Sequence, residues 1–188
     1  LACLDLLVGL GLAKKNILVV DRSGVIYQGR IPAVDSYKSK YLADTTARTL
    51  ADATQGADIF LGLSSANVLK PEMVATMADQ PIILALANPI PEIMPELVKS
   101  VRSDAVIATG RSDYPNQVNN VLCFPFIFRG ALDVGACTIN EAMKIASVNA
   151  IADLAKMSVP EEVFSIYDHE QLIFGPEYIL PKPFDSRL

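Results

Sequence analysis

The sequence predicts an α/β protein with a doubly wound parallel sheet, followed by a helical block and an extended tail. Short apolar segments rich in β-branched residues alternate with helical patterns over residues 1–114, as expected for strands joined by right-handed crossover helices. After Pro115, long apolar runs with alanine-rich helical periodicity replace this alternation. With 188 residues, 51% of them hydrophobic and 20% charged, the chain is long enough for one domain with a buried core.

Composition excludes several classes of partner. Pro, Gly or charged residues interrupt every apolar stretch before the roughly 20 residues that a membrane span requires. The net charge of -5 and the lack of a Lys/Arg cluster argue against nucleic acid, so a small-molecule ligand is expected. Cys3, Cys123 and Cys137 are widely spaced, which indicates neither a disulfide framework nor a zinc site and favours the cytoplasm. The single histidine, His169, is expected on the surface.

The first elements follow from apolar spacing. Leucines and Val8 recur at helical intervals from Leu1 to Leu12, and the glycines at positions 9 and 11 end this helix. Residues 16–20 are short, apolar and β-branched, which predicts a parallel strand buried on both faces and ending at Asp21. Residues 25–27 predict a brief extended piece, and residues 45–53 predict a helix. The chain starts abruptly in a helical pattern without Met, so we expect it to be a fragment of a longer protein.

The remaining elements complete the predicted architecture. Strands are expected at 58–63, 81–87 and 104–108, separated by helices at 71–77 and 91–100. Pro95 lies inside the second of these helices and leaves its register open. Residues 119–157 predict the helical block, and residues 163–188 predict a short helix and an extended tail. We therefore divide a single domain into an α/β core (1–114), a helical block (115–160) and a C-terminal tail (161–188).

Polar residues follow each strand of the predicted sheet. In open α/β sheets, ligands bind beyond the carboxyl ends of the strands. Helix caps and turns also require such residues, and this alternative applies well to Ser64. It applies less well to Asn88, because the following Pro89 disfavours a helical conformation there. The polar groups that follow the four strands are Asp21, Ser64 with Ser65, Asn88, and Thr109-Gly110-Arg111.

Asp21 occupies the position at which a dinucleotide-binding fold places an acid on the adenosine ribose. That acid lies about 20 residues after a glycine-rich turn, so the turn would fall just before Leu1. Gly9-Leu10-Gly11 is not this turn, because it closes a helix instead of opening one. The predicted fold is therefore Rossmann-like but lacks its first strand and glycine turn. Arg22 could receive the 2′-phosphate of NADP, whereas Asp21 would repel it, so the choice between NAD and NADP stays open.

The segment from Arg111 to Pro125 combines charges, turn signals and adjacent carboxamides before a long apolar run. Burying a carboxamide without a hydrogen bond costs roughly 1–3 kcal/mol. Asn119 and Asn120 therefore need a partner, which is either the backbone of the following helix or a polar ligand.

This segment, continued by Phe124 to Asp133, closely resembles the asparagine-pair signature of malic enzymes, particularly the bacterial NADP-dependent type. Further segments resemble the same family in matching order, so that the resemblance covers the whole chain. These segments are Ala2-Cys3-Leu4-Asp5-Leu6-Leu7, Leu84-Ala85-Leu86-Ala87-Asn88-Pro89, Gly130-Ala131-Leu132-Asp133-Val134 and Tyr178-Ile179-Leu180-Pro181-Lys182-Pro183-Phe184-Asp185.

The resemblance implies the NAD(P)-binding part of an enzyme that oxidises and decarboxylates L-malate to pyruvate and carbon dioxide. It places Asn88 near nicotinamide and substrate, and it assigns Asn119 and Asn120 to contacts with malate and cofactor. Asp21, Arg22 and Ser64 complete the expected cofactor contacts. The family's catalytic Tyr and Lys, its Mg²⁺ or Mn²⁺ carboxylates and its glycine turn are all expected upstream of Leu1. No catalytic or metal-ligating residue is therefore expected in this chain, which by itself should be inactive; a homo-oligomer is expected.

Two other classes remain compatible with the residues. Another Rossmann-type dehydrogenase, such as one that acts on amino acids, would share the polar strand ends but would have no reason to carry the asparagine pair. A non-catalytic regulatory or interaction module could also keep the fold.

Overall fold

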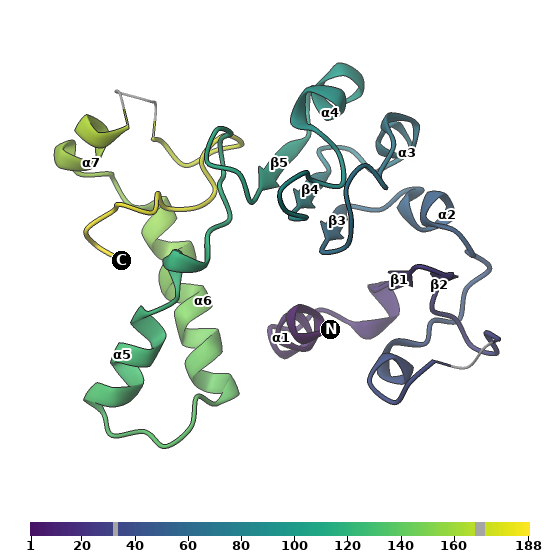
Figure 1. Ribbon diagram of the computed structural model, residues 1–188, viewed down its shortest axis with the longest axis horizontal. Coiled ribbons are helices and arrows are strands. Elements are labelled where there is room, and N and C mark those ends of the chain that lie inside the picture. The colour runs from purple at the N-terminus through teal and green to yellow at the C-terminus, as the bar shows by residue number, and fades with distance from the viewer. Residues whose placement is uncertain (32–33, 168–171) are drawn as a thin grey trace.

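The computed structural model describes residues 1–31, 34–167 and 172–188 (Figure 1), so His169 lies outside the described residues. The first half contains α1 (Ala2–Gly9), η1 (Lys14–Asn16), β1 (Val20–Asp21), β2 (Gly24–Val25), η2 (Lys38–Tyr41), α2 (Leu50–Thr54), β3 (Ile59–Gly62), α3 (Pro71–Ala75) and β4 (Ile82–Ala85). The second half contains α4 (Pro95–Val101), β5 (Val106–Thr109), η3 (Asn120–Leu122), α5 (Phe126–Asp133), α6 (Glu141–Lys156) and α7 (Glu161–Ile166). No helix in these ranges is long and apolar enough to cross a membrane.

The predicted α/β class is confirmed by a parallel sheet in the order β3-β4-β5. Ile59 of β3 pairs with Ile82 of β4, which in turn pairs with Val106 of β5. Helices α2, α3 and α4 lie next to one another along one side of this sheet (Figure 1). Apolar side chains from the strands and helices form the core between them, namely Leu69, Val74, Met77, Ile83, Ala85, Ile93, Val98, Ala105 and Ile107. This core fixes the relative positions of the three carboxyl strand ends.

The first predicted strand differs from expectation. Residues 16–20 do not join the parallel sheet; instead Val20 and Asp21 form a short antiparallel hairpin with β2. The amide of Ile26 donates to the carbonyl of Val19 at 2.7 Å, which extends the hairpin by one hydrogen bond. Among the described residues, no strand pairs with the outer edge of β3. An apolar segment needs a neighbour of matching length to form a parallel ladder, and residues 16–20 find none here.

Two helices start later than expected, one at a proline and the other at a capping threonine. The helix predicted at 91–100 begins at Pro95, a position at which the missing amide hydrogen is tolerated. Pro91, Glu92 and Ile93 instead form a buried non-helical segment. Helix α2 begins at Leu50, where Thr49 caps the first turn.

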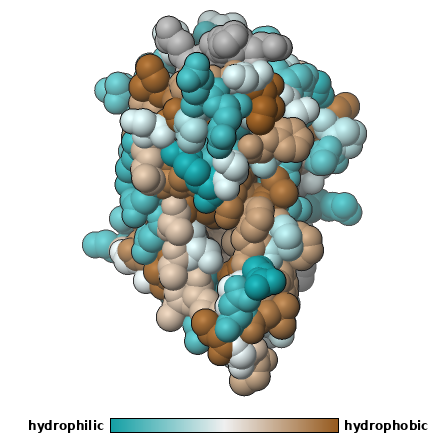
Figure 2. All heavy atoms as spheres, turned by 90° about the vertical axis from the view of Figure 1, so that its left-hand side faces the viewer, coloured by the Kyte–Doolittle hydropathy of each residue, from teal (hydrophilic) through white to brown (hydrophobic). Residues whose placement is uncertain are grey.

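The predicted helical block consists of two antiparallel helices, α5 and α6, that lie side by side (Figure 1). Helix α1 packs on α6, with Gly9 facing Ile145. The expected short helix is α7, and a second small core of Val163, Leu172 and Tyr178 holds it against the tail. Figure 2 faces this side of the molecule and shows apolar residues gathered between polar ones at the surface.

Candidate functional site

Asp21 ends β1 and lies at the centre of a charged cluster. Its carboxylate accepts hydrogen bonds from the guanidinium of Arg30 at 2.7 Å and from the ammonium of Lys38 at 2.8 Å. The backbone amide of Ser23 donates to the same carboxylate at 2.9 Å. Burial raises the pKa of Asp21, but the bonds from Lys38, Arg30 and Ser23 outweigh it and lower the pKa from 3.8 to about 2. The two cations therefore more than offset the negative charge of Asp21 at neutral pH.

Arg22 follows Asp21 in the exposed turn between β1 and β2. No hydrogen bond or ion pair joins its side chain to any other residue that the structure describes. From the sequence, Arg22 was expected to attract a 2′-phosphate and Asp21 to repel it. The pairing of Asp21 with Arg30 and Lys38 offsets the negative charge that would cause this repulsion. Neither Arg30 nor Lys38 was identified from the sequence, because they lie 9 and 17 residues away from Asp21 along the chain.

Ser64 and Asn88 lie just past the carboxyl ends of β3 and β4, as predicted. Both residues are exposed. The amide of Leu86 donates to the carbonyl of Gly62 at 3.1 Å, which closes the last ladder contact between the two strands. The peptide bond between Asn88 and Pro89 is cis. These two polar side chains therefore share one edge of the parallel sheet, whereas Asp21 belongs to the separate hairpin.

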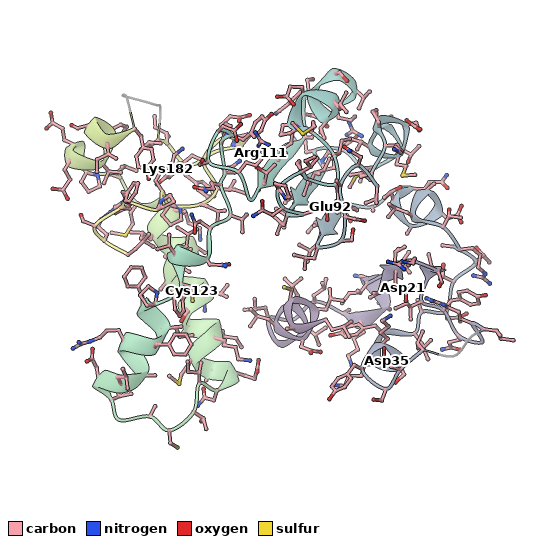
Figure 3. All side chains as sticks on the ribbon, in the orientation of Figure 1. Asp21, Asp35, Glu92, Arg111, Cys123 and Lys182 are labelled. Carbon is pink, nitrogen blue, oxygen red and sulfur yellow. The ribbon has the colours of Figure 1, made fainter. Side chains whose placement is uncertain are left out.

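Glu92 joins the two turns that carry Ser64 and Asn88, and the sequence reasoning missed it. Its side chain is fully buried at the carboxyl ends of β3 and β4 (Figure 3). One carboxylate oxygen accepts from the backbone amide of Ser64 at 2.8 Å, and the other accepts from the backbone amide of Ala87 at 3.0 Å. The sequence contained a signal that Glu92 is buried. This acid lies among prolines and apolar residues, whereas an acidic residue on the surface normally has polar neighbours.

The loop after β5 carries three asparagines, and the one that is buried differs from expectation. The buried carboxamide is that of Asn116, at 3% exposure, whereas Asn119 is half-buried and Asn120 is exposed. The side chain of Asn116 donates to the carbonyls of Ile107 and Pro176, at 2.9 and 2.7 Å, and accepts from the amide of Ile179 at 2.8 Å. A buried carboxamide needs such partners, and the tail supplies them.

Asn119 and Asn120 lie at the start of the short helix η3. The side-chain oxygen of Asn119 accepts from the amide of Val121 at 3.1 Å and so caps this helix. The capping alternative therefore applies to the oxygen of Asn119, but its amide group makes no hydrogen bond with another described residue. The side chain of Asn120 makes none either. Both carboxamides thus keep donors that a polar ligand could use.

A cavity of about 430 Å³ adjoins this loop and the C-terminal tail. Asn119 and Gln117 line it on one side, and Lys182 lines it on the other. At its rim Arg111 pairs with Asp113 at 2.6 Å, and the hydroxyl of Tyr114 donates to Glu96 at 2.5 Å. Figure 3 places Arg111 and Lys182 on the loop and tail segments that meet here. The predicted asparagine segment thus borders a hollow lined by carboxamide groups and by the ammonium of Lys182.

The described residues include no group of three or more His, Cys, Asp or Glu residues arranged to hold a metal ion. The three cysteines are free, and Cys123 is the least exposed of them.

A parallel sheet with polar side chains at its carboxyl ends, next to an acid-ended hairpin, defines an α/β domain of the dinucleotide-binding class. Comparison with known families narrows this class. A family model described as "Malic enzyme, NAD binding domain" matches residues 8–169. The chain belongs to this family, and the resemblance noted from its sequence is confirmed.

Individual relatives agree with the family model. The NADP-dependent malic enzyme of Escherichia coli (strain K12) is 64% identical over 189 residues, which cover 100% of this chain and 25% of that protein. The NAD-dependent malic enzyme of Rhizobium meliloti (strain 1021) is 57% identical over 188 residues, which cover 100% of this chain and 24% of that protein. The chain thus spans about a quarter of the length of these relatives.

Solved structures show the same fold. The crystal structure of an NAD-dependent malic enzyme from Thermotoga maritima matches with a TM-score of 0.79 and 37% identity, over 97% of this chain and 44% of that one. The malic enzyme of Entamoeba histolytica matches with a TM-score of 0.77 and 32% identity, over 96% and 36% of the two chains.

Proposed function

We propose that this chain is the dinucleotide-binding part of an enzyme that oxidatively decarboxylates L-malate to pyruvate and carbon dioxide with NAD(P). The observation that carries the proposal is the position of Ser64 and Asn88 at adjoining strand ends, in a chain whose relatives are malic enzymes. Ligands of open parallel sheets bind at this edge. The proposal therefore combines the family with a specific place for the nicotinamide end of the cofactor.

The asparagines of this chain orient the reactants in the proposed reaction. Asn88, Asn119 and Asn120 present carboxamide donors, which can bind hydroxyl and carboxylate oxygens of malate without adding a charge that competes with a metal ion. Ser64 and Asn119 also contact the cofactor. The bound cofactor supplies the acceptor for the hydride that leaves malate. The acid-base groups and the ligands for Mg²⁺ or Mn²⁺ come from parts of the enzyme outside this chain.

The Asp21 cluster fits the adenosine end of the cofactor. Asp21 can accept hydrogen bonds from ribose hydroxyls, because its carboxylate, whose pKa is lowered to about 2, is ionised at neutral pH. The guanidinium of Arg22, which has no partner among the described residues, lies beside that position and suits a 2′-phosphate. The relatives include an NADP-dependent malic enzyme, from E. coli, and an NAD-dependent one, from R. meliloti. We expect this chain to bind both cofactors and Arg22 to favour NADP.

The proposal includes a cytoplasmic homo-oligomer. Three free cysteines suit a reducing compartment. Helix α5 and the turn after it expose large apolar side chains, which a second copy of the enzyme could cover. These are Phe126 at 41%, Phe128 at 49%, Leu132 at 76% and Val134 at 76% exposure. Light scattering of the full-length enzyme measures the assembly, and a monomer would contradict this part of the proposal.

The test is malate-dependent reduction of NAD and NADP by the full-length enzyme that contains this chain. We expect turnover with malate and none with glutamate, which separates a malic enzyme from an amino-acid dehydrogenase. Replacing Asn88 or Asn120 with Ala should lower kcat/KM for malate by about tenfold or more, because each loses a substrate contact. A full-length enzyme that turns over neither substrate with either cofactor would favour a non-catalytic module and would refute the proposal.

A further inference from the structure

Glu92 is a fully buried carboxylate without a cationic partner among the described residues. Its side-chain hydrogen bonds with the described residues come from the turns after β3 and β4: the backbone amides of Ser64 and Ala87, and the hydroxyl of Ser64 at 3.4 Å. Burial of a carboxylate is unfavourable unless hydrogen bonds replace its hydration. The two backbone amides provide that replacement, so the carboxylate and the two turns hold one another in place.

The surroundings of Glu92 are built for this contact. A Cβ atom on Gly62 would lie 2.5 Å from the carboxyl carbon of Glu92 and 2.8 Å from both of its oxygens. Only glycine at the end of β3 leaves room for the side chain. The backbone of Glu92 is fixed as well, because its carbonyl accepts from the amide of Leu69 at 3.1 Å.

The carboxylate replaces strand pairing at the point where pairing stops. The bond from the amide of Leu86 to the carbonyl of Gly62 is the last one of the β3–β4 ladder. Beyond this bond, the amides of Ser64 and Ala87 donate to the carboxylate of Glu92 and not to the neighbouring strand. Ala87 directly precedes Asn88, so the position of the Asn88 turn depends on this carboxylate.

We propose that Glu92 is a positioning residue for the reaction of this enzyme, and that it acts by holding Asn88 and Ser64 in a fixed relative position. The inference rests on the proposed function, because it concerns the orientation of malate and nicotinamide. Glu92 itself is buried behind the turns and touches neither ligand. A displacement of about 1 Å at a group that orients a substrate can lower the rate by about 10²-fold.

The first test is Glu92→Gln in the full-length enzyme. The amide group of Gln places a donor against a backbone amide that also donates, so one of the two contacts is lost. We expect kcat/KM for malate to fall by about tenfold or more at temperatures where circular dichroism shows a folded protein. Glu72→Gln on α3 is the matched control, because Glu72 is exposed in the first turn of that helix, and it should leave kcat/KM within about twofold of the parent.

A double-mutant cycle with Asn88→Ala separates positioning from a general loss of stability. If Glu92 acts through Asn88, then the double variant should be within about threefold of Asn88→Ala alone. The proposal would be overturned if the losses of kcat/KM in the two single variants simply multiply in the double variant. It would also be overturned if the kcat/KM of Glu92→Gln stays within about twofold of the parent. If Glu92→Gln does not fold, the same cycle is run with Glu92→Asp. The side chain of Asp is one methylene shorter, so its carboxylate cannot reach both amides. A parent enzyme that does not turn over malate refutes the proposed function instead.

Discussion

Charge balance around single residues sets the chemistry of the proposed adenosine subsite. Asp21 exposes 21% of its side chain, Arg30 exposes 8% and Lys38 exposes 35%. Because both cations bind the same carboxylate, Asp21 does not present a bare negative charge to a phosphate. We therefore expect the neighbouring Arg22 to bind a 2′-phosphate.

Arg22→Ala tests this assignment. In the full-length enzyme we expect the KM for NADP to rise by about tenfold, since a charge-assisted bond to phosphate is lost. The KM for NAD should stay within about twofold, because NAD has no 2′-phosphate. Steady-state kinetics with both cofactors measures the ratio of the KM for NADP to the KM for NAD. Arg129→Ala is the control, since Arg129 is exposed on α5 and pairs with Asp133; equal changes for the two cofactors would contradict the assignment of Arg22.

Gly62→Ala tests the close approach of Glu92 to β3. The new methyl group would collide with the carboxyl group of Glu92, so we expect the free energy of unfolding to fall by about 1–3 kcal/mol. Gly130→Ala is the control, because nothing lies within 4 Å of a Cβ at this position in α5. That change should raise stability by about 0.5–1 kcal/mol. Urea denaturation measures both variants, and an unaltered midpoint for Gly62→Ala would show that Glu92 moves aside freely.

At the scale of elements, the loop after β5 is fastened to the C-terminal tail by one side chain. Asn116 adopts a left-handed conformation with φ of 56°, which Asn tolerates better than most residues. Its carboxamide bonds both to β5, through Ile107, and to the tail, through Pro176 and Ile179. The tail in turn carries Lys182 to the cavity that Asn119 lines.

Two substitutions at Asn116 separate its side chain from its backbone. Asn116→Gly keeps the left-handed conformation but removes all three bonds, and it should lower the free energy of unfolding by about 1–3 kcal/mol. Asn116→Ala adds the strain of a positive φ, so it should cost about 1 kcal/mol more. Denaturation measures stability, and limited proteolysis reports whether residues 176–188 become more accessible. Equal stability of the parent and Asn116→Gly would show that the tail does not depend on these bonds.

At the scale of the whole molecule, β3 and β5 are the two edge strands of the parallel sheet that the structure describes. Among the described residues, β3 pairs only with β4, while β1 pairs only with β2. The Rossmann-like prediction places a further strand and the glycine turn in sequence before Leu1, and this remains a prediction. The chain spans about a quarter of the curated malic enzymes that it matches.

The isolated 188-residue chain should therefore lack malate-dependent reduction of NAD or NADP. The resemblance assigns the base and the metal ligands to sequence outside this chain. Absorbance of the reduced cofactor measures turnover, with the full-length enzyme as the positive control. Measurable turnover by the isolated chain would overturn the assignment of the reactive groups to other parts of the enzyme.

The sequence by itself determined the family, the α/β class, and three of the four predicted strands. Local patterns suffice for these, because buried parallel strands such as β4 are continuous apolar runs bounded by turn residues. The sequence also placed Ser64 and Asn88 at the strand ends.

Only the tertiary structure decided which polar groups are buried and what they bind. The ion pairs of Asp21, the bonds of Glu92 to the turns after β3 and β4, and the bonds of Asn116 to the tail join residues from 5 to 63 positions apart. From the sequence, Asn119 and Asn120 were expected to be buried and to need a partner, yet the buried carboxamide is that of Asn116. Burial depends on how distant segments pack, so periodicity along the chain cannot reveal it. The predicted parallel strand at residues 16–20 was wrong for the same reason, because a strand forms only where a neighbouring segment is available to pair with it.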